Sequence, residues 1–194
     1  MISVDLNESI LDFSQIDIDE EQVVVIDNLF PDWFIEYAHR KIMDSSGWRF
    51  GHLTATRNPD AEIPAFSQKI YPDALSPIAG DTMFPMIYHA VCRTMSNVQI
   101  GEILINGQQF WHNTVFHQDC KDNGMTMLYY VNQDINESYG GQTHIKVDDD
   151  VLKVAPKPGR ICLFLGKLMH KGESFNSDYT GLRSTIAYKI GRHV

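Results

Sequence analysis

The second half of the sequence is a series of short apolar runs separated by residues that form turns. From residue 98 onward the runs are rich in β-branched, aromatic and aliphatic side chains, and Gly, Asn, Asp and Pro are frequent between them. The runs are VQIGEILIN, TVFHQD, MTMLYYVN, QTHIKV, VLKVA, RICLFL, KLMH and STIAYKI. Many short strands with such turns are typical of a β-sandwich or barrel. The pattern therefore predicts a jelly roll over about residues 98–191.

The first half of the chain has a different pattern. Residues 22–30, QVVVIDNLF, predict a buried strand, and residues 31–47 predict a helix that starts at a proline and stops at a glycine. Residues 52–80 contain four prolines and little periodicity, which indicates mostly loop. Residues 81–97 predict a second helix.

Together these patterns predict one domain over residues 1–194 in the α+β class, mainly β. A double-stranded β-helix, the jelly roll of about residues 98–191, would be backed by N-terminal helices within about residues 1–97.

The charge and the cysteine content restrict the partners of this domain. The formal net charge is −9, and phosphate binding favours a basic stripe, so we expect no nucleic-acid partner. Three cysteines form an odd, sparse set that favours reduced thiols. We find no signal peptide and no apolar run long enough to span a bilayer. The expectation is a soluble, cytoplasmic protein without a membrane partner.

The stretch TVFHQDC places His117 and Asp119 two residues apart. In a strand, residues i and i+2 point to the same face, so both side chains could bind one ion. A lone H-x-D pair arises often by chance, and a site needs a third ligand, which His170 in KLMHKG supplies. Two histidines and a carboxylate form the facial triad of non-haem iron(II) oxygenases, but a catalytic zinc accepts the same ligands. The ligands alone leave the metal open.

The run LRSTIAYKI alternates between two faces. Its apolar face would pack on the helices, which would turn Arg183, Thr185 and Ala187 toward the inside of the barrel. A buried guanidinium is costly unless an anion pairs with it. A second strand, MTMLYYVN, presents three residues on one face, and these are Thr126, Leu128 and Tyr130. A tyrosine and a threonine opposite an arginine predict a pocket for a small carboxylate.

This ordered set of motifs resembles the 2-oxoglutarate- and iron(II)-dependent dioxygenases, in particular the prolyl 4-hydroxylase-like branch, over about residues 100–191. The motifs that carry the resemblance, in chain order, are HQD, TMLYYVN, YGGQTHI, PKPGRICLF, MH and GLRSTIAY. Relative to the family's commonest spacing, the loop at 171–180 carries an insertion. The strand before HQD lacks the tyrosine that many prolyl hydroxylases have there.

The resemblance implies a role for each matching residue. His117, Asp119 and His170 would be the iron ligands and catalytic residues. Arg183 would bind the distal carboxylate of 2-oxoglutarate, while the other end of that cosubstrate chelates the metal. The remaining residues expected at the cosubstrate are Tyr130, Thr126, Leu128 and Thr185.

The implied reaction uses O2, converts 2-oxoglutarate to succinate and CO2, and hydroxylates a C–H bond. Ascorbate is a candidate additional cofactor. The substrate would be a peptidyl proline, an amino acid or another small molecule. Two alternatives stay open: a non-catalytic metal-binding jelly-roll protein, and a cupin-like metal isomerase or hydrolase. We also hypothesise that residues 52–70, with Trp111 near the mouth, form a lid over the metal.

Overall fold

The computed structural model describes residues 1–5, 23–52, 65–70, 81–93, 95–112 and 114–192, which form two β-sheets and two α-helices. The strands of the larger sheet are β1 (Ile2–Asp5), β2 (Val23–Asp27), β3 (Arg49–His52), β4 (Ala65–Ile70), β5 (Val98–Gln108), β6 (Met125–Tyr130), β9 (Ile161–Leu165) and β11 (Arg183–Arg192). The strands of the smaller sheet are β7 (Thr143–Val147), β8 (Asp150–Val154) and β10 (His170–Gly172).

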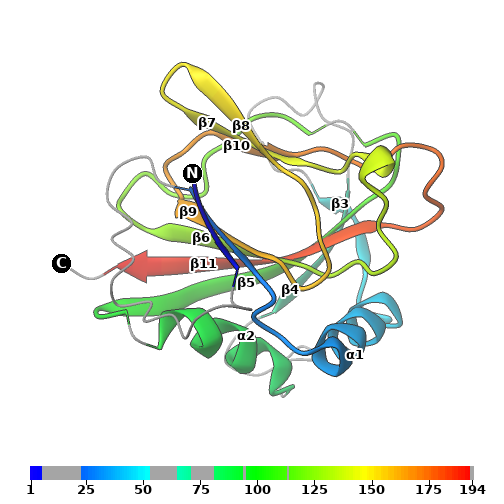
Figure 1. Ribbon diagram of the computed structural model, residues 1–194, viewed down its shortest axis with the longest axis horizontal. Coiled ribbons are helices and arrows are strands. Elements are labelled where there is room, and N and C mark those ends of the chain that lie inside the picture. The colour runs from blue at the N-terminus through cyan, green and yellow to red at the C-terminus, as the bar shows by residue number, and fades with distance from the viewer. Residues whose placement is uncertain (6–22, 53–64, 71–80, 94, 113, 193–194) are drawn as a thin grey trace.

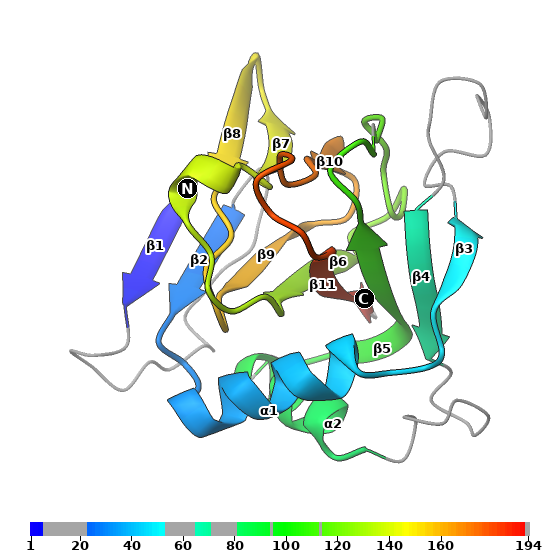
Figure 2. The same ribbon diagram turned by 90° about the vertical axis from the view of Figure 1, so that its right-hand side faces the viewer.

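The two sheets face each other, and the helices lie on the outer side of the larger sheet (Figures 1 and 2). The larger sheet has the order β1-β2-β9-β6-β11-β5-β4-β3, and the smaller has the order β10-β7-β8. All strand pairs are antiparallel except β1 with β2. The helices are α1 (Asp32–Met43) and α2 (Met83–Cys92), and a short 3-10 helix covers Glu137–Tyr139. This arrangement confirms the predicted mainly-β jelly roll backed by N-terminal helices.

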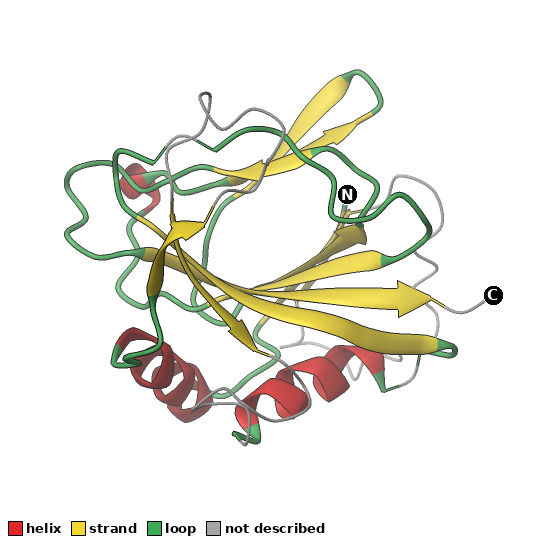
Figure 3. Ribbon diagram, turned by 180° about the vertical axis from the view of Figure 1, so that it is seen from behind, coloured by secondary structure: helices red, strands yellow, loops and turns green. Residues whose placement is uncertain are grey.

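Strand β11 lies near the centre of the larger sheet and separates the apolar core from the space between the sheets. Its residues Ile186, Tyr188 and Ile190 are buried. The Tyr188 hydroxyl donates to the carbonyl oxygen of Phe84 in α2, at 3.1 Å, so this face packs toward the helices as predicted. The helices cover that face of the sheet when the molecule is seen from behind (Figure 3).

Both helices are shorter than the sequence predicts. Helix α1 ends at Met43 and not near Gly47, and the Asp44 N–H donates to the Arg40 carbonyl at 2.9 Å. Asp44 and the two serines after it favour turns over a further helical turn. Helix α2 starts at Met83, whose N–H is accepted by the Asp81 carboxylate at 2.8 Å, and ends at Cys92. Within the described residues, neither helix has the length and apolar character needed to cross a membrane.

The predicted loop at 52–80 contains a strand. Residues 65–70 form β4, which pairs with β5 and is joined at its other side by β3. Prolines 64 and 72 flank this six-residue stretch, which itself contains no proline and so can donate to both neighbours. The lid hypothesis for 52–70 is therefore wrong for residues 65–70, and residues 53–64 lie outside the described part of the chain.

The packing between the larger sheet and the helices predicts a large penalty for Ile105→Ala. Ile105 in β5 is completely buried beside Ile186. Removing its side chain should lower the free energy of unfolding by about 2–5 kcal/mol, because the transfer term and the cavity term add. Denaturant unfolding measures this, with Val151→Ala as the control, since Val151 is 44% exposed. Equal losses in the two variants would contradict this account of the core.

Candidate metal centre

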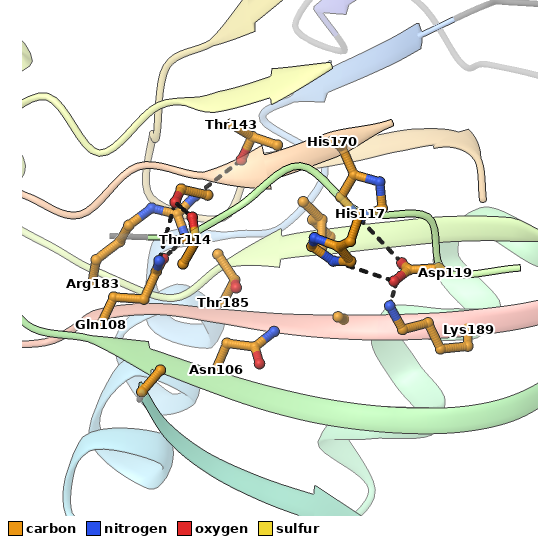
Figure 4. Close-up of a pocket in the computed structure, with 14 residues that line it drawn as sticks. Asn106, Gln108, Thr114, His117, Asp119, Thr143, His170, Arg183, Thr185 and Lys189 are labelled. Carbon is orange, nitrogen blue, oxygen red and sulfur yellow. Dashed lines mark hydrogen bonds and ion pairs between the residues drawn. The ribbon is translucent and has the colours of Figure 1, made fainter. Parts of the chain in front are cut away.

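His117, Asp119 and His170 lie together on the inner side of the smaller sheet (Figure 4). One potential ligand atom of each lies within 4.8 Å of those of the other two. The His117 Nε2 atom is 3.6 Å from Asp119 Oδ1, and the His170 Nε2 atom is 3.4 Å from Asp119 Oδ2. The triad that the sequence predicts is therefore present as a group, and its role as the set of iron ligands stays a prediction.

Backbone hydrogen bonds fix the positions of the three side chains. Residues 114–119 do not form the predicted strand, but His117 makes an isolated antiparallel bridge with His170. The His117 N–H donates to the His170 carbonyl at 3.0 Å, and the reverse bond measures 2.9 Å. The Asp119 N–H donates to the Gly166 carbonyl at 2.9 Å. His117 and Asp119 are thus held beside β10 by isolated backbone hydrogen bonds and not by a regular strand.

The hydrogen bonds of the two imidazoles fit a metal ion. The Nδ1 atom of His117 lies 3.2 Å from the Val115 carbonyl oxygen, and that of His170 lies 2.8 Å from the Leu168 carbonyl oxygen. A carbonyl oxygen only accepts, so each Nδ1 carries a proton, and Nε2 is the ring nitrogen left to bind a metal. Both Nε2 atoms face the Asp119 carboxylate, and together with its oxygens they form a donor set suited to a cation.

The protonation states of the triad also suit a metal. Burial, together with the charge of His170, lowers the pKa of His117 to about 4. Burial alone would raise the pKa of Asp119, but the hydrogen bond with His170 and the charge of Lys189 hold it well below its usual range. At neutral pH the site therefore has a neutral His117 and an ionised Asp119, which are the forms that ligate metals.

One oxygen of Asp119 has two further partners. The Thr126 hydroxyl donates to Oδ2 at 2.5 Å, and the ammonium group of Lys189 contacts the same oxygen. Thr126 was expected to line the cosubstrate pocket, and the structure places its hydroxyl against the triad instead.

Arg183 lies at the other end of the same pocket and is only 3% exposed (Figure 4). Its Nε donates to the Gly141 carbonyl at 2.7 Å, and its two terminal nitrogens donate to Gln108 Oε1 at 2.8 Å and Thr143 Oγ1 at 2.9 Å. All three acceptors are neutral, and no described carboxylate forms an ion pair with Arg183. Burial lowers the pKa of Arg183, although an arginine stays charged at neutral pH. The pocket therefore contains a buried positive charge whose hydrogen-bond acceptors are neutral, with Glu173 acting on it only at longer range.

The other residues expected at the cosubstrate surround this arginine to different degrees. Leu128 and Thr185 line the pocket between Arg183 and the triad. Tyr130 is buried behind it, where its hydroxyl donates to Thr143 at 2.7 Å and its ring centroid lies 5.8 Å from the Arg183 guanidinium carbon. The Thr143 hydroxyl, which accepts a hydrogen bond from Tyr130 and another from Arg183, thus links the two residues.

Five further polar residues of the pocket are absent from the sequence prediction, and these are Asn106, Gln108, Thr114, Thr143 and Lys189. The alternation of side chains along two strands could have identified three of these residues from the sequence. Lys189 continues the alternation of Arg183, Thr185 and Ala187, and the same period of two places Asn106 and Gln108 on one face of β5. Trp111, expected near the mouth, is 43% exposed and does not line the described pocket.

The loop between β10 and β11 packs against Gly141, whose carbonyl accepts from Arg183. Its Phe175 is 1% exposed and packs on Tyr179, with ring centroids 4.5 Å apart. Asn132 anchors the loop by donating to the Tyr179 hydroxyl at 3.0 Å and to the Leu182 carbonyl at 2.7 Å. The insertion that the sequence indicates at 171–180 therefore forms a packed aromatic cluster next to Gly141.

Comparisons with known proteins establish the fold. No protein-family model matches the chain, and no curated protein matches its sequence. A Trichoplax adhaerens prolyl hydroxylase, solved in complex with a hypoxia inducible factor oxygen degradation domain peptide fragment, is similar with a TM-score of 0.67 at 18% identity, over 89% of this chain and 84% of that chain.

Two bacterial structures are similar over most of their length. A Pseudomonas putida prolyl-4-hydroxylase gives a TM-score of 0.61 at 13% identity, over 89% of this chain and 93% of that chain. A Burkholderia pseudomallei oxidoreductase of the 2OG-Fe(II) oxygenase family gives a TM-score of 0.68 at 11% identity, over 88% of this chain and 86% of that chain. The chain therefore has the jelly-roll fold of the 2-oxoglutarate and iron(II) oxygenases, including the prolyl hydroxylases.

The lowered pKa of His117 predicts a pH dependence of stability in the metal-free protein. Because the pKa of His117 falls from 6.5 in the unfolded chain to about 4, the unfolded state binds more protons in this window. The free energy of unfolding should therefore fall as the pH drops from 6.5 toward 4, by up to about 1.4 kcal/mol per pH unit from this group. Denaturant unfolding in the presence of a chelator should show a shallower dependence in His117→Gln. Parallel curves for the variant and the wild type would refute the assignment.

The packing of Gly141 predicts that Gly141→Ala disturbs Arg183. Gly141 has a φ of +76°, and an added Cβ would lie 2.4 Å from the Phe175 ring. Relieving this contact displaces the Phe175 ring or the Gly141 backbone, whose carbonyl oxygen accepts from Arg183. We expect a lower melting temperature and weaker 2-oxoglutarate binding by calorimetry. Gly51→Ala, at a positive φ with open space around it, is the control for backbone strain alone. Unchanged 2-oxoglutarate affinity in Gly141→Ala would argue against this coupling.

Proposed function

We propose that this protein is an iron(II)- and 2-oxoglutarate-dependent dioxygenase that hydroxylates a C–H bond and forms succinate and CO2. The observation that carries the proposal is one pocket that joins the His117, Asp119 and His170 group to the buried Arg183. The fold shared with oxygenases of this kind supports the same conclusion.

The charges of the pocket match a dicarboxylate next to a metal. Arg183 hydrogen-bonds only to neutral acceptors, and its buried charge calls for an anion. A guanidinium recognises a carboxylate through two parallel hydrogen bonds. The distal carboxylate of 2-oxoglutarate at Arg183 would leave the other end of the molecule directed to the triad. Bound iron(II) would supply the redox chemistry with O2.

The residues around Arg183 would orient it before the cosubstrate arrives. Gln108 accepts from the guanidinium and donates through Nε2 to the Gly172 carbonyl at 3.1 Å, so its amide is held at both ends. Thr143 accepts from Arg183 and from Tyr130. Leu128 and Ala187 line the middle of the pocket and would exclude water from the cosubstrate. A preorganised, dry site strengthens the electrostatic contact with the cosubstrate.

For the primary substrate we propose a peptidyl proline or an amino acid. The support for a peptide is the fold shared with prolyl hydroxylases, one of which was solved with a peptide fragment. Ascorbate would serve to keep the iron reduced, and we propose a cytoplasmic location. A non-catalytic metal-binding jelly roll, or a cupin-like isomerase or hydrolase, would use the triad but would not need the buried Arg183.

The test of the proposal is the formation of succinate from 2-oxoglutarate by purified protein supplied with iron(II), ascorbate, O2 and a panel of prolyl peptides and amino acids. Even without a substrate, slow succinate formation is expected from the wild type. His170→Ala should abolish it, since the triad loses a ligand. Iron-dependent succinate formation that persists in His170→Ala, or none in the wild type with any member of the panel, would contradict the proposal.

The same proposal predicts the effect of Arg183→Ala on the cosubstrate. Loss of the charged partner costs about 2–5 kcal/mol, so the affinity for 2-oxoglutarate should fall roughly 30- to 5,000-fold while metal binding persists. Calorimetry measures both. Arg40→Ala is the matched control, because the Arg40 side chain is 66% exposed on α1. Unchanged 2-oxoglutarate binding in Arg183→Ala would make that arginine purely structural.

A further inference from the structure

Lys189 is a charged residue of the pocket that the proposed reaction does not use. It lies on the same face of β11 as Arg183 but at the opposite end of the pocket (Figure 4). Its ammonium group contacts Oδ2 of Asp119, and its side chain is 27% exposed, whereas that of Asp119 is 7% exposed. The pocket thus places a lysine directly on a residue of the triad.

A second carboxylate stands next to Lys189 on the neighbouring strand. In the antiparallel register, Lys189 in β11 is directly opposite Glu102 in β5. Directly opposite side chains in such a pair have their Cβ atoms about 4.5–5.5 Å apart on one face of the sheet. Glu102 is 34% exposed and pairs with Lys69 of β4 at 2.8 Å. Lys189 therefore has two carboxylates near it, one buried in the triad and one directly opposite it on β5.

Without a metal ion, the buried Asp119 needs a positive partner, because an uncompensated buried charge is strongly destabilising. Lys189 meets this need, and Thr126 adds a neutral hydrogen bond to the same oxygen. A divalent cation held by the triad would compete with the ammonium group for that carboxylate and would repel it. The four-carbon stem of lysine is long and flexible enough to reposition its charge.

We propose that Lys189 is the built-in counter-ion of Asp119 in the metal-free protein and turns to Glu102 when a divalent ion binds. Lys189 is then a positioning residue that stabilises the empty triad and lowers its affinity for the metal. Glu102 favours metal binding, since it receives the displaced ammonium group. This inference rests on the metal centre of the proposed function and does not depend on catalysis.

The test compares Lys189→Met, Glu102→Gln and the double variant with the wild type, using Mn(II) as the probe. Lys189→Met should bind Mn(II) about ten-fold more tightly by calorimetry. Substitutions of residues that contact metal ligands typically change the affinity for the metal by about this factor. In a chelator its melting temperature should fall by about 2–4 °C or more. Glu102→Gln should weaken Mn(II) binding when Lys189 is present and leave it unchanged in the double variant.

Two further substitutions separate the charge of Lys189 from other effects. Lys189→Arg keeps the charge and should restore both the wild-type affinity and the melting temperature. Lys153→Met, at an exposed position of β8, should change neither. Unchanged or weaker Mn(II) binding in Lys189→Met overturns the proposal. An equal effect of Glu102→Gln in both backgrounds overturns the part assigned to Glu102.

The outcomes also distinguish this inference from the proposed function. A wild type that does not bind Mn(II) overturns both, since neither stands without the metal centre. A wild type that binds Mn(II) and shows the expected variant pattern but makes no succinate supports the counter-ion and contradicts the dioxygenase.

Discussion

The two-faced character of β11 is the constraint on which the rest of the structure depends. One face of this strand buries Ile186, Tyr188 and Ile190 toward the helices, and the other carries Arg183 and Lys189 into the pocket. A shift of one residue in register would exchange the two faces and bury both charges in the apolar core. The apolar packing that stabilises the fold thus also determines where the charges of the site lie.

The site balances its buried charges in two different ways. At one end, Asp119 is surrounded by two imidazoles, a hydroxyl and an ammonium group, so its charge is compensated in the metal-free protein. At the other end, Arg183 hydrogen-bonds to neutral acceptors alone. This difference supports the proposed function, in which a cation binds at the triad and an anion at the arginine.

The sequence was sufficient for the class of fold and for the triad, because both depend on local patterns. Short alternating strands predict the jelly roll, and the ordered motifs place His117 and His170 in one site although they are far apart in the chain. Other features depend on tertiary partners. Strand β4 has no strong local signal and gains its hydrogen bonds from β5. The bridge between His117 and His170, which holds residues 114–119, depends on segments that are distant in the sequence. The same is true of the contact between Lys189 and Asp119.

The packed loop that carries Phe175 and Tyr179 has a consequence for the order of events in the pocket. The loop packs next to Gly141 at the Arg183 end of the pocket, where Arg183 is 3% exposed, whereas the Lys189 side chain at the other end is 27% exposed. A molecule held by Arg183 would then enter and leave past the triad. Under the proposed function, a substrate seated over the triad would trap the cosubstrate behind it, and a compulsory order of binding, cosubstrate before substrate, would follow from this arrangement.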